Sequence, residues 1–353
     1  MSPVERTWPL LLNQLIDRVD LSEEDTSWAM DQIMSGAATT AQVGGFAVAL
    51  RAKGETPEEV DGLANAMLRH ARRFTVEGRA ADIVGTGGDN SHSVNISTMA
   101  AIVTAAAGVP IVKHGNRAAS SQCGTADVLE ALGVAIDLPP AGVQATVAEL
   151  GVGFCFAPVF HPAFRYTLAP RRELGIPTSF NLLGPLTNPA LPKVGLIGCA
   201  RAAAAPLIAG VFARRGNTAL VVRGDDGLDE ITTTTTTTVW VAQDGQVRDD
   251  RITPSALGIA PALPDDLRGG DAAFNAEVVR DLVGGKPGAV RDAVLLNAAG
   301  AIAAHTGLGD DLHADLAAAI GRAAEAVDSG RAADLLRRWA ARSTELKAEH
   351  AES

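Results

Sequence analysis

A glycine-rich stretch, GTGGD at residues 85–89, follows the apolar pair Ile83 and Val84. Glycine lets the backbone turn sharply and bring its N–H groups against a bound anion. The stretch has neither the P-loop nor the dinucleotide-binding spacing, so by itself a plain turn after a strand is the simpler interpretation. NIST at 95–98 then opens an apolar helical run with good N-cap residues, beside which anions bind. The two features together favour a phosphate site.

A basic string, KHGNRAASS at 113–121, follows a predicted strand over 110–112 and therefore lies at the carboxyl end of that strand. Lys113, Arg117 and the hydroxyls of Ser120 and Ser121 suit a multiply charged phosphate. Either cation alone would be explained better as part of a solvated basic loop. The complete string favours phosphate binding.

An acidic turn, GDDGLDE at 224–230, follows another predicted strand. Neighbouring carboxylates on a loop are most often solvated surface charge. Mg²⁺, however, takes one or two carboxylates together with water and substrate phosphates. Asp229 and Glu230 fit that role, because an acidic protein that handles polyphosphate needs a cation as a bridge.

The sequence RRELG at 171–175 contains an arginine that could bind a planar carboxylate, although an arginine on a helix surface is the simpler alternative. For His161 and Tyr166 we favour local packing over catalysis, and His92 is left open. No Ser-His-Asp or Cys-His arrangement has supporting context, so nucleophilic catalysis is not indicated.

Residues 1–75 are expected to be helical. Thr56 and Glu59 form a capping box, with proline between them at the first helical position. Apolar positions then recur at helical spacing, as they do over 8–19 and 43–50. A compact helical domain follows, to which we expect helices from about 165–190 to be joined.

Near residue 80 the pattern changes to short β-rich runs that alternate with alanine-rich helices. This alternation predicts an α/β domain over 76–353 with a mostly parallel sheet flanked by helices. Such sheets bind ligands at the carboxyl ends of their strands. Seven consecutive threonines at 232–238 favour a surface or edge strand, and the tail from about Asp310 reads as helical. The expected strands are 81–84, 110–112, 153–156, 194–197 and 219–222, and the expected helices between them are 97–107, 126–132, 141–150 and 202–214.

The composition fits a two-domain globular protein: 353 residues, of which 47% are apolar and 20% charged. A net charge of −11 argues against a nucleic-acid-binding protein, because phosphate neutralisation needs surplus Lys and Arg. Three widely spaced cysteines favour a reducing cytoplasm. No signal peptide is expected, and the charge-free stretch over 90–112 is too interrupted for a membrane span.

In this order along the chain, GTGGD, NIST, KHGNRAASS, RRELG, FNLLGPLTNP at 180–189 and GDDGLDE resemble the anthranilate phosphoribosyltransferase family. The resemblance spans the chain from the helical N-terminus to about Asn297. It implies a nucleoside-phosphorylase-like fold, in which a small helical domain meets a larger α/β domain at a hinge. It also implies homodimers through the helical domain and Mg²⁺-dependent transfer of phosphoribosyl from phosphoribosyl pyrophosphate to anthranilate, a step of tryptophan biosynthesis.

The resemblance also assigns site residues. Two Mg²⁺ ions per subunit would be held by Ser97, Asp229 and Glu230, and Lys113 would act electrostatically, with no dedicated acid or base. Anthranilate would contact Gly85, Asn116 and Arg171, with the arginine facing its carboxylate. The residues implied for phosphoribosyl pyrophosphate are Gly85, Gly88, Asp89, Ser93, Asn95, Ile96, Ser97, Thr98, Lys113, His114, Gly115, Asn116, Arg117, Ala118, Ala119, Ser120, Ser121 and Thr125.

Three residues depart from the family's pattern. Cys123 and Thr125 stand where smaller residues or serine are usual, and Arg223 stands where a histidine often precedes the acidic turn. A pyrimidine-nucleoside phosphorylase is the nearest competing enzyme, but it uses free phosphate and resembles this chain less. Two further hypotheses are a non-catalytic relative that binds nucleic acid and an enzyme that makes the same transfer to another amine.

Overall fold

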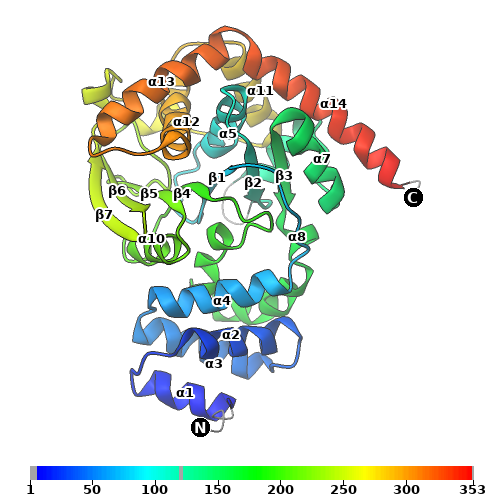
Figure 1. The fold of residues 1–353 in the computed structure, drawn as a ribbon, viewed down its shortest axis with the longest axis vertical. Coiled ribbons are helices and arrows are strands. Elements are labelled where there is room, and N and C mark those ends of the chain that lie inside the picture. Colours follow the sequence, from blue (N-terminus) through cyan, green and yellow to red (C-terminus); the bar gives the residue numbers. More distant parts are fainter. Residues whose placement is uncertain (1–5, 119–121, 352–353) are drawn as a thin grey trace.

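The computed structural model describes residues 6–118 and 122–351 and has a helical layer beside a sheet that carries helices on both faces (Figure 1). The sheet has strand order β3-β2-β1-β4-β5-β6-β7. Pairing is parallel from β3 to β5 and antiparallel for β6 and β7. This confirms the predicted α/β class. The strands are β1 Ala81–Gly85, β2 Ile111–Gly115, β3 Val152–Phe156, β4 Val194–Gly198, β5 Thr218–Gly224, β6 Thr237–Gln243 and β7 Gln246–Ile252.

Successive side chains of the central strands enter two different apolar clusters. Ile83, Leu196 and Leu220 lie in the cluster under α5 and α12, whereas Val84 and Ile197 lie in the cluster that faces α10 and the helical layer. A strand sends alternate side chains to opposite faces, so a strand buried on both faces must be apolar throughout. This explains why these strands appear in the sequence as continuous apolar runs. The helices of the α/β part are α5 Ile96–Ala106, α6 Thr125–Ala131, α7 Pro140–Leu150, α8 Ala157–Phe160, α10 Ala205–Arg214, α11 Ala272–Val283, α12 Ala289–Thr306, α13 Leu312–Asp328 and α14 Arg331–Ala351.

The helical layer consists of α1 Trp8–Ile16, α2 Glu23–Met34, α3 Thr40–Lys53 and α4 Pro57–Arg69. Capping boxes begin α2, α3 and α4, the last through the predicted Thr56 and Glu59 pair. The layer is completed by 162–182, where α9 Leu168–Leu174 and two short 3-10 turns pack against α2 and α3. α4 faces the sheet domain and α1 lies farthest from it (Figure 1).

The helical layer and the sheet domain share one apolar cluster. It joins Leu63 of α4 to Ile208 of α10 and Val221 of β5. Gly210 allows this contact, because a Cβ added there would lie 2.8 Å from Cγ of Pro57. The division at 75/76 therefore crosses a continuous core, and it stays a prediction.

Three sequence predictions about elements need correction. Lys113, His114 and Gly115 are the last residues of β2 rather than part of a loop after it. Only Thr237 and Thr238 of the threonine run belong to a strand, because the hydroxyls before them bind the acidic turn instead. The exposed strand β7 is missed from sequence, since its charged residues are consecutive, at 248–251, and leave no alternating apolar face.

Within the described residues, no helix has the length and apolar character needed to cross a membrane. The predicted charge-free stretch forms α5 and the start of β2, both packed inside the sheet domain. The helical tail is confirmed as α13 and α14.

Candidate active site

The glycine-rich segment and the acidic turn meet where β1 and β4 end. Gly85 and Gly198 are the last residues of these paired strands. A Cβ on Gly85 would lie 2.3 Å from Oδ2 of Asp229, and one on Gly198 would lie 1.6 Å from the Asp229 carbonyl oxygen. The backbone N–H of Gly87 donates to Oδ2 of Asp229 at 2.7 Å. Two glycines are therefore required for the acidic turn to reach this edge of the sheet.

The three predicted metal ligands lie together. Ser97, in the first turn of α5, hydrogen-bonds Glu230 through its backbone and its side chain. Burial raises the pKa of Glu230 to about 7, although Lys113 opposes the shift. Burial, with the charges of Glu230 and Asp89, raises the pKa of Asp229 well above its usual value. Three carboxylates thus lie close together with too little positive charge beside them. A divalent cation would stabilise this arrangement.

The chemistry of these donors suits Mg²⁺. Carboxylate and hydroxyl oxygens are hard ligands, and Mg²⁺ keeps several waters while it bridges a protein to substrate phosphates. Among the residues that the structure describes, no group of three or more His, Cys, Asp or Glu is arranged to hold an ion alone.

Lys113 points from β2 into the centre of the site and is 1% exposed. Its Nζ donates to the Ile83 carbonyl and to Oγ of Ser97, the latter at 3.2 Å. Burial lowers the pKa of Lys113, while Asp82, Glu230 and Asp229 oppose that shift. The ammonium group therefore lies among carboxylates and beside the N-terminus of α5.

The start of α5 has no side-chain cap. Asn95 is its N-cap residue, but its amide donates to the Cys123 carbonyl at 3.2 Å and its Oδ1 accepts from Asn275 at 2.8 Å. The first backbone N–H groups of the helix have acceptors within the protein: Ile96 donates to the Val94 carbonyl, Ser97 to Glu230 and Thr98 to the Asn95 carbonyl. The positive end of the helix dipole still favours an anion beside it. Oγ1 of Thr98 lies 3.4 Å from Oγ1 of Thr125, so the two predicted threonines share this corner.

Arg117 lies in a different environment from the one the sequence predicts. Its guanidinium binds Asp127 at 2.8 Å and Glu130 at 2.9 Å on α6. These carboxylates raise its pKa. In this conformation the guanidinium is paired with carboxylates of the protein and is not free to bind a phosphate. Ala119, Ser120 and Ser121 lie outside the described residues, and Ala118 donates its N–H to Asp127 at 3.0 Å.

A pocket of about 580 Å³ joins this corner to the helical layer. Gly85, Asn116 and Arg171, the three residues predicted for anthranilate, all line it. Burial lowers the pKa of Arg171. Its guanidinium lies 5.2 Å from the ring centroid of Phe164. The pocket therefore offers an aromatic wall and an arginine that has no carboxylate partner among the described residues.

The chain matches two protein-family models. A glycosyl transferase family a/b domain covers residues 77–333, and a glycosyl transferase family helical bundle domain covers residues 9–71. Over 349 residues it is 65% identical to the anthranilate phosphoribosyltransferase of Saccharopolyspora erythraea, covering 99% of both chains. The chain belongs to the anthranilate phosphoribosyltransferase family.

Solved structures of this family share the fold. The anthranilate phosphoribosyltransferase of Thermus thermophilus superposes with a TM-score of 0.88 at 39% identity, over 95% of this chain and 99% of that one. The enzyme of Saccharomyces cerevisiae, in complex with PRPP and Mg, superposes with a TM-score of 0.86 at 27% identity, over 97% and 99%.

Two histidines have surroundings that sequence reasoning does not anticipate. His161 lines the pocket of this family member, with its ring centroid 5.1 Å from that of His114. Burial lowers the pKa of His114 to about 4 and that of His161 to about 3. Both rings are therefore neutral at physiological pH. The motif FHP does not distinguish His161 from a packed core histidine. Its neighbour His114 lies far away in the sequence, near the end of β2, so the contact cannot be read from the local sequence.

The other predicted residues lie around the same edge of the sheet. Ser93 pairs through a β-bridge with Arg268, and Ile96 is buried under the start of α5. Gly115 allows the close approach of Phe154, which would lie 2.9 Å from a Cβ at that position. Arg223 donates to the Ala200 carbonyl at 2.9 Å. The structure thus brings Gly85, Gly88, Asp89, Ser97, Lys113, Asp229 and Glu230 to one region, while their roles stay predictions.

Proposed function

We propose that the chain transfers the 5-phosphoribosyl group from phosphoribosyl pyrophosphate to the amine of anthranilate. The products are N-(5-phosphoribosyl)anthranilate and pyrophosphate, and the reaction is the second step of tryptophan biosynthesis from chorismate. The observation that carries the proposal is the position of Gly85. It contacts Asp229 of the acidic turn and also lines the pocket that contains Arg171.

Transfer needs charge stabilisation more than it needs an acid or a base. Loss of pyrophosphate from C1 of the ribose builds positive charge on the sugar and negative charge on the leaving group. Lys113 and the positive N-terminal end of α5 stabilise the negative charge. The amine of anthranilate is already a nucleophile, and Arg171 holds the acceptor's carboxylate so that the amine faces C1. Attack inverts C1 through an oxocarbenium-like state.

When bound, Mg²⁺ would supply positive charge that offsets the negative charge of the departing pyrophosphate. We propose two ions per subunit, held by Ser97, Asp229 and Glu230, with Asp89 close enough to influence them. Asn95, Thr98 and Thr125 line the place of the donor's phosphates at the start of α5. The pocket of about 580 Å³ that contains Arg171 is the acceptor pocket. Asn116 follows β2 and lines this pocket, so we place it between donor and acceptor.

We also propose how the chain assembles and where it acts. Leu10 and Ile16 of α1 and Val48 of α3 are 38%, 70% and 39% exposed, on the part of the helical layer remote from the sheet. Apolar side chains exposed together are typical of an interface. We propose a homodimer formed through this layer, in the cytoplasm, acting on small molecules without a nucleic-acid or membrane partner.

The loss of anthranilate fluorescence tests the reaction. We expect the signal to fall only when phosphoribosyl pyrophosphate and Mg²⁺ are both present. Replacing anthranilate with other aromatic amines tests the acceptor. Conversion of thymidine in the presence of phosphate, without conversion of anthranilate, would instead assign the chain to the nucleoside phosphorylases.

A further inference from the structure

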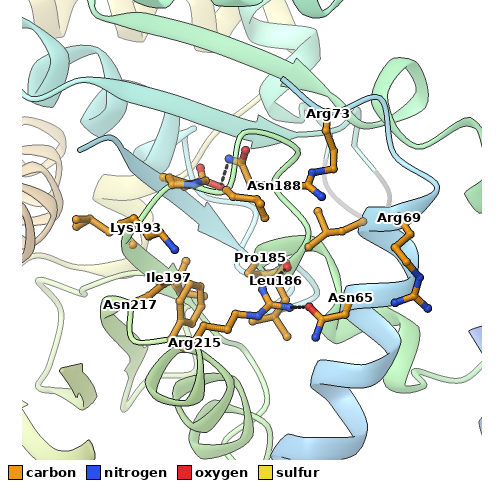
Figure 2. A pocket seen from close by; sticks show the side chains of 17 residues that line it. Asn65, Arg69, Arg73, Pro185, Leu186, Asn188, Lys193, Ile197, Arg215 and Asn217 are labelled. Atoms are coloured by element: carbon orange, nitrogen blue, oxygen red, sulfur yellow. Dashed lines mark hydrogen bonds between the residues drawn. The ribbon is translucent and has the colours of Figure 1, made fainter. Parts of the chain in front are cut away.

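A second pocket lies at the opposite edge of the sheet, where β1, β4 and β5 begin. Its volume is about 410 Å³. α4 and the segment after it form one wall, residues 185–197 form another, and the turn before β5 closes it (Figure 2). The pocket therefore lies between the helical layer and the sheet, on the side away from the site described above. We call it the underside pocket.

Four cations line the underside pocket, and two of them have no acidic partner. Arg69 pairs with Asp31 at 2.6 Å and Arg215 pairs with Asp61 at 2.8 Å. Arg73 and Lys193 have no carboxylate within 4.0 Å in the part of the chain that the structure describes. Figure 2 shows these two side chains on opposite sides of the pocket. A chain with a net charge of −11 thus places two uncompensated cations around one hollow.

The one carboxylate in the lining has its hydrogen-bond partners within the protein. Asp82 accepts from Nδ2 of Asn188 at 2.8 Å and from the backbone N–H of His114 at 3.1 Å. The charge of Lys113 also acts on it, partly opposing the rise in pKa that burial causes. Asp82 therefore has partners of its own and forms no ion pair with Arg73 or Lys193.

A buried amide adds a hydrogen-bonding group to the pocket. Asn217 lines it, is 8% exposed, and has no hydrogen-bond partner for its Oδ1 among the described residues. An unsatisfied buried acceptor costs about 1–3 kcal/mol. Because this oxygen is itself buried, a ligand that brings an O–H donor would remove this cost once the amide turns into the pocket. Apolar contacts for a short carbon chain are available from Leu68, Leu191 and Ile197.

We propose that the underside pocket binds a small phosphomonoester that carries hydroxyl groups, of the size of a short sugar phosphate. The phosphate lies between Arg73 and Lys193, whose long, exposed side chains can turn toward it and donate charge-assisted hydrogen bonds. A hydroxyl donates to Oδ1 of Asn217. A volume of about 410 Å³ is at the lower end of the range of small-molecule sites, which suits such a ligand.

Calorimetric titration with glycerol 3-phosphate tests this proposal, in the presence of Mg²⁺ and saturating phosphoribosyl pyrophosphate to occupy the donor site. We expect wild-type protein to bind at millimolar or lower concentration. The double variant Arg73→Gln with Lys193→Gln should bind at least tenfold more weakly. The control, Arg72→Gln with Lys347→Gln, removes the same two charges from exposed positions outside the pocket and should bind as wild type does.

A second pair of titrations separates the contact to the ligand's hydroxyl from the contacts to its phosphate. Asn217→Ala should weaken binding of glycerol 3-phosphate but leave binding of inorganic phosphate unchanged. No binding by wild-type protein, equal binding by the two double variants, or complete displacement by the donor would each overturn the proposal. Comparison of the double variants does not require the transferase reaction, so a failure of the proposed function would be recognised separately.

Discussion

At the scale of single residues, Arg171 gives the acceptor pocket its charge. It is partly buried, lies over Phe164 and has no carboxylate partner among the described residues. Burial lowers the pKa of Arg171, because no neighbouring anion offsets the desolvation of its guanidinium. The sequence alone does not separate this arrangement from an arginine on a helix surface, because the α9 segment follows 3-10 turns rather than a long periodic helix.

Replacing Arg171 with alanine should raise KM for anthranilate roughly tenfold or more, because a hydrogen bond to a charged group contributes about 1.5–3 kcal/mol. KM for phosphoribosyl pyrophosphate should change much less. Steady-state kinetics with each substrate varied in turn measures both constants. Arg172→Ala, next to it and exposed, is the matched control. Equal increases in the two constants would argue against a contact with the acceptor.

His114 links the site to stability in acid. Burial lowers its pKa to about 4, so the folded protein favours the neutral ring more than the unfolded chain does. The stabilisation that results from this pKa shift is complete above about pH 6.5 and is lost as the pH falls toward 4. Between about pH 7 and 5, the free energy of unfolding of wild-type protein should fall by about 2 kcal/mol more than that of His114→Gln, because one pKa unit corresponds to about 1.4 kcal/mol.

Urea unfolding at the two pH values measures this difference. His350→Gln, at an exposed position near the end of α14, is the control and should keep the wild-type pH dependence. Identical pH dependence in wild-type protein and His114→Gln would show that this ring does not control acid stability.

At the scale of elements, the threonine run holds the acidic turn in place. Oγ1 of Thr232 donates to Asp226 at 2.7 Å, and Thr234 donates to the same carboxylate. Thr238 donates to Asp225 at 2.9 Å, and Thr236 also binds Asp225. The hydroxyls thus fix the first half of a turn whose second half contains Asp229 and Glu230.

Removing two of these hydroxyls with Thr232→Val and Thr234→Val should loosen the turn and raise the Mg²⁺ concentration needed for half-maximal rate several-fold. The shape of valine is close to that of threonine, so packing is largely kept. Thr235→Val is the control, because Thr235 is exposed and lies outside the set of hydroxyls that bind the acidic turn. A change in maximal rate with an unchanged Mg²⁺ requirement would contradict a role in positioning the acidic turn.

The sequence predicts most elements because propensity and local contacts act in the same direction. Thr56 and Glu59 make the start of α4 recognisable, and the doubly buried strands read as apolar runs. The prediction for the threonine run is wrong because β-branching favours a strand, whereas hydrogen bonds to Asp225 and Asp226 decide its conformation. The surroundings of Arg117 are equally hard to foresee, since its partners lie on α6.

At the scale of the whole molecule, the acceptor pocket and the underside pocket both lie between the helical layer and the sheet. Met67 of α4 lines the first, and Asn65 and Leu68 of the same helix line the second. The shared apolar cluster joins the two layers between them. Movement of α4 relative to the sheet would therefore change both pockets together.

The proposed homodimer is testable at this scale. One chain has a mass of 36.3 kDa, and sedimentation equilibrium should give twice that value for wild-type protein. Ile16→Glu with Leu10→Glu should give the single-chain mass, because charges in an apolar interface are costly. Val247→Glu, at an exposed position on β7, is the control. A wild-type monomer would rule out the proposed interface.

We propose above all that the acidic turn holds the donor through divalent cations. The most direct measurement is the Mg²⁺ dependence of anthranilate consumption by the double variant Asp229→Asn with Glu230→Gln. We predict a turnover at least a hundredfold below wild type and a requirement for Mg²⁺ that no longer saturates, since each charge lost from a partly buried site removes about 1.5–3 kcal/mol. A variant with wild-type rate and wild-type Mg²⁺ dependence would contradict the account.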